Sequence, residues 1–535
     1  MGFLGAHHGL TPHLDGLAKL SIVFERAYSQ APLTVVSHAT ILSGAYPQTH
    51  HASELGASLA TGLPYLPDLI HARGYRTAAF VGSNLLDPRN GFAPGFDRGF
   101  DVYDAGFQQS RRNDDFHQST ECHPDQVVAR ATKWLDPNAQ QPFFLWVHLC
   151  ESHRSSGRSS GRSYESAISA IDMALGKLVS TLHRQHLDTG SMIIVAADYG
   201  ESLGAHGEDT HGIFLYDETV HVPLLVKLPQ NTMAGKRVKG RVSLLDIAPT
   251  VLETARIPIP SQMQGHSLLR IARASAEADQ PAYARSDFPQ QAFGWSVLES
   301  WRAGKYLYVR APQPELYDLS ADPKASRNLA LSSPAILQTM AAQLKAFDNH
   351  VGNEAGKPVE TGLTSSEIQK LASLGYIGLQ KTTVGVDAPV AGTDPKNAIA
   401  IANRTLNAML VLDEGKPEKA IPTFREVLAG QTNTYLAQYG LGMALAQQRQ
   451  YSEAIEHLHR AIELQPDSAW AHYFMGVSLF KIGDFKSSAI HLEIASGRLP
   501  EFGGLHTVLA QVYERLGRTQ DATREHAKAS QLGRN

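Results

Sequence analysis

The sequence predicts an α/β domain with a mostly parallel sheet flanked by helices, followed by an all-α repeat solenoid. Two observations predict this order. Up to about residue 378, short apolar runs typical of buried strands alternate with segments of helical periodicity. From about residue 399 onward, the sequence repeats with a period of 34 residues. We expect an α/β core over 1–260, the C-terminal part of that domain over 261–378, a linker over 379–398 and about four repeats over 399–535.

The candidate strands of the α/β core are four apolar runs, at 77–82, 143–149, 192–197 and 223–227. A helix is expected over 164–186, where apolar residues recur at about every third or fourth position. Ligands of parallel α/β sheets bind beyond the carboxyl ends of the strands. Polar side chains that follow these runs are therefore the first candidates for a functional site.

The repeats carry small residues at a fixed place, namely Ala420, Ala454, Ser488 and Ala522. Small residues let paired helices approach closely, and Pro466 and Pro500 are expected to end the second helix of two pairs. The pattern resembles the tetratricopeptide repeat, and this resemblance implies a concave surface for a protein or peptide partner. Self-assembly through the repeats is an alternative that the sequence leaves open.

Composition excludes several classes of protein. A hydrophobic content of 43% with 19% charged residues is typical of a globular chain, and a net charge of −4 argues against a nucleic-acid partner. Two cysteines, Cys122 and Cys150, are too few for a disulfide framework. No run approaches the roughly 18 apolar residues of a membrane helix, and no signal-peptide pattern opens the sequence. The location stays open, and an exported or periplasmic protein is expected if the true start lies upstream.

Polar residues follow two of the candidate strands. Asp198 and Tyr199 follow the run 192–197, His153 follows the run 143–149, and His211 comes slightly later. An acid and several histidines at strand ends are typical of a metal and oxyanion site. A single histidine is more often a surface or capping residue, so the prediction depends on their convergence.

Thr34 precedes a predicted short helix. Ser37 is a suitable N-cap for this helix and Gly44 a suitable stop. The Thr34 hydroxyl would then lie just before a helix N-terminus, whose partial positive charge favours an anionic ester and a developing alkoxide. The alternative is that both hydroxyl residues only cap the helix.

Five motifs occur in the order found in sulfatase-type hydrolases of the alkaline phosphatase superfamily. They are 11–15 (TPHLD), 31–47, 197–201 (ADYGE), 215–224 and 315–329. Residues 8–378 therefore resemble this family, and the resemblance implies metal-dependent hydrolysis of a sulfate or phosphate ester. A domain of this kind followed by tetratricopeptide repeats is an arrangement that we associate with bacterial proteins.

The resemblance also implies roles for individual residues. Thr34 takes the nucleophile position and, with Asp198, a metal-ligand position. His153 and His211 take anion-binding or proton-transfer positions, and His38 stands in the place of the arginine that supports the nucleophile. The implied cofactor is a divalent metal ion, Ca²⁺ or Mg²⁺, or Zn²⁺ or Mn²⁺ if the protein is closer to the phosphoesterases.

Two residues depart from the family pattern at the site. Thr34 cannot yield the formylglycine of typical sulfatases, because its Cβ carries a methyl group, and a directly attacking threonine is found in the phosphodiesterase branch. Tyr199 stands where the family usually has a histidine or asparagine ligand, and a neutral tyrosine is a poor ligand. Phosphate esters are therefore a second substrate class.

The strand that opens the family's sheet is a third departure. In the family this strand carries acidic metal ligands and comes just before a segment that resembles residues 1–5. We expect it upstream of Met1, because loss of a core strand would expose a sheet edge. The alternative is that hydrolysis has been lost and that the protein is an inactive, repeat-based binding scaffold.

Overall fold

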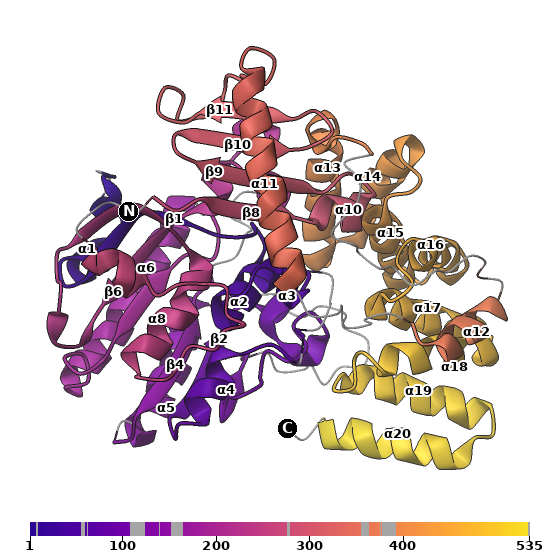
Figure 1. Ribbon diagram of the computed structural model, residues 1–535. Coiled ribbons are helices and arrows are strands. Elements are labelled where there is room, and N and C mark those ends of the chain that lie inside the picture. The colour runs from indigo at the N-terminus through magenta and orange to yellow at the C-terminus, as the bar shows by residue number, and fades with distance from the viewer. Residues whose placement is uncertain are drawn as a thin grey trace.

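The computed structural model describes residues 1–6, 9–54, 59–60, 62–106, 123–138, 140–150, 164–274, 279–354, 363–374, 376 and 392–532. Figure 1 shows an α/β core at the left, an antiparallel sheet at the top and an array of paired helices at the right. Within these described ranges, no helix combines the length and the apolarity needed to cross a bilayer.

The first sheet of the core has the strand order β5-β6-β1-β7. Its strands are β5 (Ile193–Ala196), β6 (His221–Lys227), β1 (Ile22–Tyr28) and β7 (Arg237–Ser243). β7 runs parallel to β1, whereas β6 runs antiparallel to both β1 and β5. Three of the four strands thus share one direction, which confirms the mostly parallel sheet. The centre of this sheet is apolar and shielded from solvent, since Ile22 and Phe24 of β1 and Leu224 of β6 are fully buried.

The second sheet is entirely parallel and has the order β3-β2-β4. It contains β3 (Val102–Asp104), β2 (Arg76–Val81) and β4 (Phe143–His148). β4 is an edge strand of this sheet and β5 an edge strand of the first. Every residue of both strands is only half-buried, unlike those of the neighbouring β6 or of β2. Among the described residues, each of these strands therefore keeps an open edge inside the core.

The helices of the core cover the two sheets. They are α1 (Pro12–Ala18), α2 (Thr34–Ser43), α3 (Pro47–His50), α4 (Leu66–His71), α5 (Pro124–Asn138), α6 (Tyr164–Arg184), α7 (Asp217–Val220), α8 (Ile247–Thr254) and α9 (Leu268–Arg273). The four predicted strands and the helix predicted over 164–186 are present with bounds shifted by one or two residues. β1 and β7 were not predicted, because Glu25 and Arg26 interrupt one strand and Arg237, Lys239 and Arg241 the other.

A third sheet, of order β11-β10-β9-β8, is fully antiparallel. Its strands are β8 (Ala282–Ser286), β9 (Leu298–Ala303), β10 (Tyr306–Arg310) and β11 (Glu315–Asp318). α10 (Phe288–Phe293) lies between β8 and β9 in the chain, and α11 (Pro334–Glu354) crosses one face of the sheet (Figure 1). Its strand β8 packs against β1 and β7 of the first sheet.

The repeats form four antiparallel helix pairs. Their helices are α13 (Pro395–Asp413), α14 (Pro417–Gly430), α15 (Tyr435–Gln447), α16 (Tyr451–Leu464), α17 (Ala469–Ile482), α18 (Phe485–Ser496), α19 (Gly503–Arg515) and α20 (Thr519–Leu532). A Cβ on Gly442 would lie 2.6 Å from Leu458 Cγ, and one on Gly476 would lie 2.5 Å from Leu492 Cγ. Close helix approach thus recurs at equivalent places, Gly442 and Gly476, in two successive repeats.

The predicted linker over 379–398 is too long at its C-terminal end. α13 begins at Pro395, with Asp394 as its N-cap, so the last residues of that segment are helical. A proline in the first turn of a helix leaves no amide that needs a partner, which explains why Pro395 starts α13 instead of breaking it. Most of the predicted linker lies outside the described residues. α12 (Ser365–Ala372), which precedes it, packs against α18.

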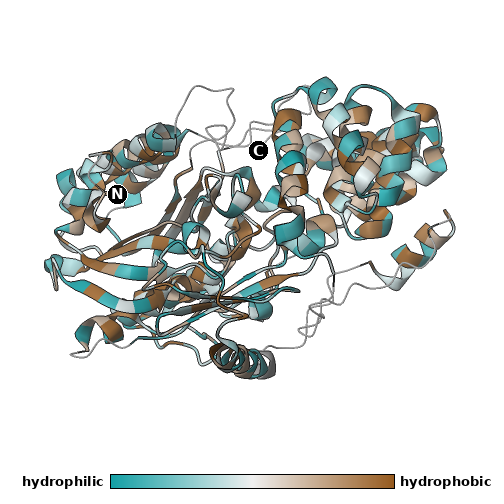
Figure 2. Cartoon of the chain, turned by 90° about the horizontal axis from the view of Figure 1, so that it is seen from above, coloured by the Kyte–Doolittle hydropathy of each residue, from teal (hydrophilic) through white to brown (hydrophobic). Residues whose placement is uncertain are grey.

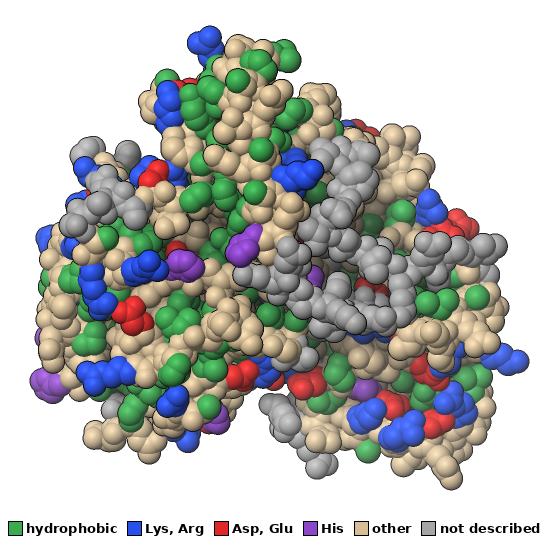
Figure 3. Space-filling model, viewed as in Figure 1, with side chains coloured by type: hydrophobic (Ala, Val, Ile, Leu, Met, Phe, Trp, Pro, Cys, Tyr) green, Lys and Arg blue, Asp and Glu red, His purple; other side chains and the backbone are tan. Residues whose placement is uncertain are grey.

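Hydropathy and charge follow this architecture. Apolar residues run along the strands and along the facing sides of the repeat helices (Figure 2). On the face shown in Figure 3, acidic and basic side chains are interspersed over the core and the repeats. This mixture agrees with the small net charge of −4.

Candidate functional site

Thr34 is the first residue of α2, and its position differs from the expectation. The helix was predicted to start after Ser37, but it begins at Thr34 with Leu33 as its N-cap. Ser37 lies inside the helix, and its hydroxyl donates to the Asp198 carbonyl oxygen at 2.7 Å. This long-range bond explains why Ser37 does not serve as a cap. Gly44 ends the helix in a left-handed conformation, as predicted.

The N-terminus of α2 already has an anionic neighbour. The Val35 amide donates to Glu54 Oε2 at 2.9 Å. The amide groups of a first helical turn attract negative charge, whether from a side chain or from a ligand. An ester anion at this helix end would thus meet the Glu54 carboxylate next to the Thr34 hydroxyl.

Thr34 contacts Tyr199 directly. The two hydroxyl oxygens are 2.9 Å apart, and the Thr34 side chain is almost completely buried. Burial, with the nearby Asp198 and Glu54 carboxylates, raises the pKa of Tyr199 well above its usual 10. Tyr199 is therefore a neutral phenol at physiological pH and acts here as a hydrogen-bond partner of Thr34.

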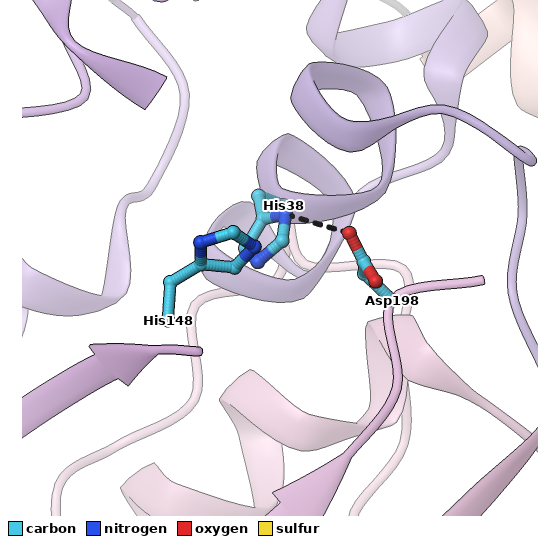
Figure 4. Close-up of side chains that lie close together, drawn as sticks. All are labelled: His38, His148 and Asp198. Atoms are coloured by element: carbon cyan, nitrogen blue, oxygen red, sulfur yellow. Dashed lines mark ion pairs between the residues drawn. The ribbon is translucent and has the colours of Figure 1, made fainter. Parts of the chain in front are cut away.

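Three side chains from different parts of the chain form a cluster of potential metal ligands. His38 comes from α2, His148 ends β4, and Asp198 follows β5 (Figure 4). Their ligand atoms all lie within 4.8 Å of one another. His38 Nδ1 is 3.5 Å from Asp198 Oδ2, and the His38 and His148 rings meet edge to face. The carboxyl ends of β4 and β5 therefore converge at this point.

This cluster fits a divalent metal ion of intermediate softness. His38 Nδ1 donates to the Thr34 carbonyl oxygen at 2.9 Å, which leaves His38 Nε2 as the nitrogen that can bind a metal ion. Two imidazoles and one carboxylate suit Zn²⁺ or Mn²⁺ better than Ca²⁺ or Mg²⁺, which prefer oxygen ligands. Sequence reasoning missed His148, because it lies inside an apolar run and only the residues after that run were considered.

His211 lies beside Tyr199. The two ring centroids are 4.5 Å apart, and His211 Nδ1 is 3.3 Å from Glu201 Oε1. Thr34, His38, Asp198, Tyr199 and His211 are thus brought into one region. His153, which was also predicted for the site, lies outside the described residues.

The loop that carries His211 is held from inside by Glu208. This carboxylate is 1% exposed and accepts hydrogen bonds from the backbone amides of Ile213 and Phe214. Burial raises its pKa from the usual 4.5 to about 8, although these two hydrogen bonds act in the opposite direction. Glu208 is therefore largely protonated at neutral pH and anchors the segment on both sides of His211.

Family models match three parts of the chain. Residues 1–257 match the model described as Sulfatase, and residues 210–350 match the C-terminal model of N-sulphoglucosamine sulphohydrolase. Residues 442–483 match a TPR repeat. The predicted sulfatase-type domain and the tetratricopeptide repeats are confirmed by these matches.

Curated proteins of similar sequence include two sulfatases. Arylsulfatase K of Rattus norvegicus is 30% identical over 250 residues, which cover 41% of this chain and 43% of that protein. The ulvan-active sulfatase of Formosa agariphila is 26% identical over 406 residues, which cover 66% of this chain and 79% of that protein. The chain thus spans less than half of the rat protein.

Solved structures support the fold of the first part. The phosphonate monoester hydrolase of Agrobacterium radiobacter aligns with a TM-score of 0.54 at 18% identity, over 66% of this chain and 93% of that chain. At this identity the likeness shows the fold alone. It confirms the α/β class predicted for the N-terminal part.

Proposed function

Because the chain carries a sulfatase domain followed by tetratricopeptide repeats, we propose that it is a metal-dependent hydrolase of sulfuric or phosphoric esters with Thr34 as its nucleophile. The observation that carries this proposal is that Thr34 contacts both His38, a member of the cluster of His38, His148 and Asp198, and Tyr199, the residue after Asp198. A hydroxyl nucleophile beside metal ligands at strand ends is the arrangement that ester transfer requires.

The chemistry assigned to the side chains follows from their contacts. Thr34 Oγ1 attacks sulfur or phosphorus, its proton passes to a carboxylate, for which Glu54 at the N-terminus of α2 is the candidate, and the bond to the leaving alcohol breaks. Tyr199 stays protonated and orients Thr34 Oγ1 by the hydrogen bond between the two hydroxyl groups. His211, next to Tyr199, is the candidate to give a proton to the leaving oxygen. Water then cleaves the ester formed on Thr34.

His38, His148 and Asp198 would hold the metal ion. When bound, such an ion supplies Lewis-acid stabilisation of the ester oxygens. We propose Zn²⁺ or Mn²⁺ as the ion. In zinc titrations of the full chain, His148→Ala should weaken binding at least ten-fold, whereas His183→Ala, at an exposed histidine on α6, should not. Equal affinities of the two variants would contradict this metal site.

The site also calls for one further strand. β4 and β5 each have an open edge, and the residues at their carboxyl ends converge at His148 and Asp198. Met1 and Phe3, like Leu149 and Ile193 of β5, pack against one apolar cluster that includes Leu225 of β6. We infer that one further strand would pair with these two edges and complete the sheet beside the cluster.

Two ester classes remain in the proposal. The sulfatase relatives favour sulfate esters, whereas the threonine nucleophile favours phosphate esters. Aryl sulfate and aryl phosphate, each tested with the full chain and with added Zn²⁺ or Mn²⁺, separate the two. Thr34→Ala should abolish turnover. Ser43→Ala, at the opposite end of α2, should keep it and serves as the control.

An inactive, repeat-based binding protein is the second candidate. The Glu54 carboxylate at the N-terminus of α2 favours it, because that carboxylate competes with an ester anion for the same amides. In this case the repeats would bind a peptide partner and the core would turn over neither ester. Metal-dependent turnover that disappears in Thr34→Ala would refute this candidate.

A further inference from the structure

The first helix of the repeats is attached to the antiparallel sheet. The Gln313 amide donates to Asp394 Oδ2 at 2.9 Å, just before α13 begins. Lys396 Nζ donates to Glu315 Oε1 at 2.6 Å, and Glu315 is 2% exposed. Ala402 of α13 is fully buried in an apolar cluster that includes residues of the core. α13 is thus held by a buried ion pair and by apolar packing (Figure 1).

The same helix reaches the loop that leads to His211. Asn403 Nδ2 donates to the Gly207 carbonyl oxygen at 2.8 Å, and the Asp209 amide donates to Asn403 Oδ1 at 3.2 Å. Gly207 has a φ of 84°, and a Cβ there would lie 3.5 Å from the Ile399 side chain. One amide side chain of the repeats therefore binds the backbone on both sides of Glu208.

Backbone hydrogen bonds close this loop on itself. The Ser202 amide donates to the Thr210 carbonyl, and the Gly204 amide donates to the Glu208 carbonyl, each at 2.8 Å. His211 follows Thr210 directly. The closed loop therefore contacts Asn403 at one end and carries His211 at the other. His211 in turn lies beside Tyr199, the hydrogen-bond partner of Thr34.

We propose that α13 supports the loop that carries His211 and that Asn403 is the positioning residue for this loop. This inference rests on the proposed function for its catalytic consequence. The repeats are then a structural part of the hydrolase as well as a surface for a partner. Loss of the two Asn403 hydrogen bonds would leave Thr34 in place but would let His211 move relative to it.

The test uses the full chain, with Asn403→Ala and, as a matched control, Asn407→Ala. Asn407 has the same side chain one turn further along α13 and is exposed. The primary measurement is hydrogen exchange of the backbone amides in 202–214. Two hydrogen bonds of ordinary strength correspond to roughly a ten-fold change in a local opening equilibrium. We expect exchange to be about ten-fold faster in Asn403→Ala and unchanged in Asn407→Ala, with equal melting temperatures.

Kinetics separate positioning from general stability. If the aryl ester is turned over, Asn403→Ala should lower kcat about ten-fold and leave KM unchanged, because binding at the metal cluster is not altered. Exchange that is equal in the two variants, or a fall in kcat that is equal in both, would overturn the proposal. Hydrogen exchange does not depend on turnover, so absence of activity in all the proteins would contradict the proposed function and not the role of Asn403 in the loop.

Discussion

Glu208 makes the loop before His211 sensitive to pH. The pKa of Glu208 is raised from 4.5 to about 8 because its carboxyl group is buried. Glu208 therefore stays protonated up to about pH 8 in the folded protein, whereas it loses its proton near pH 4.5 in the unfolded chain. The folded state therefore binds more protons in this window, and stability falls as the pH rises through it. Between pH 6 and pH 9 the loss attributable to Glu208 is roughly 3 kcal/mol.

Glu208→Gln keeps the shape and an oxygen acceptor for the amides of Ile213 and Phe214, but it does not ionise. Denaturant unfolding at pH 6 and pH 9 should show that the variant gains roughly 3 kcal/mol relative to the natural protein between these two values. Asp209→Asn, at the exposed neighbouring residue, is the control and should show no such gain. An equal pH dependence of Glu208→Gln and the natural protein would refute the role given to burial.

Two further perturbations test the packing around the site and in the repeats. Gly200→Ala would place a Cβ 2.1 Å from the Glu218 carbonyl oxygen, so we expect a loss of about 3 kcal/mol, seen as a lower melting temperature; an unchanged value would contradict the close contact. His472 is fully buried, and burial is the main reason why its pKa is lowered from 6.5 to about 4. The unfolded chain therefore binds a proton at His472 before the folded protein does. The free energy of unfolding is highest above pH 6.5 and falls as the pH is lowered through this range. The variant His472→Gln carries the residue found at the equivalent place of the preceding repeat, Gln438. Between pH 7 and pH 5 its free energy of unfolding should fall by roughly 2 kcal/mol less than that of the natural protein. An equal fall in the two proteins would refute this.

The repeats and most of the buried strands could be predicted because their signals are local. A 34-residue period marks a unit that packs against its own copies, and Gly442 against Leu458 is repeated as Gly476 against Leu492. β1 escaped prediction because its charged residues Glu25 and Arg26 interrupt the apolar run. Its burial depends on β6 and β7, which lie about 200 residues away in the chain.

The candidate site could be predicted where a polar residue follows a strand or precedes a helix. Asp198 and His211 were found in this way, and Thr34 was found because it precedes a helix. The start of α2 was misplaced because the hydroxyl of Ser37 binds the Asp198 carbonyl, a contact that no local pattern indicates. His148 was missed because a histidine that ends an apolar strand has the same sequence context as a core residue. Asn403 has no sequence signal, since it is one polar residue on a repeat helix.

The residue that becomes modified during turnover is the most direct test of Thr34 as the nucleophile. The full chain is mixed with aryl sulfate or aryl phosphate and Zn²⁺, quenched by acid within the first turnover, and mapped by peptide mass spectrometry. The proposed function predicts a sulfo or phosphoryl group on Thr34, which is absent when the metal is removed and absent in Thr34→Ala. Turnover with Thr34 unmodified, or with the group on another residue, would contradict the account.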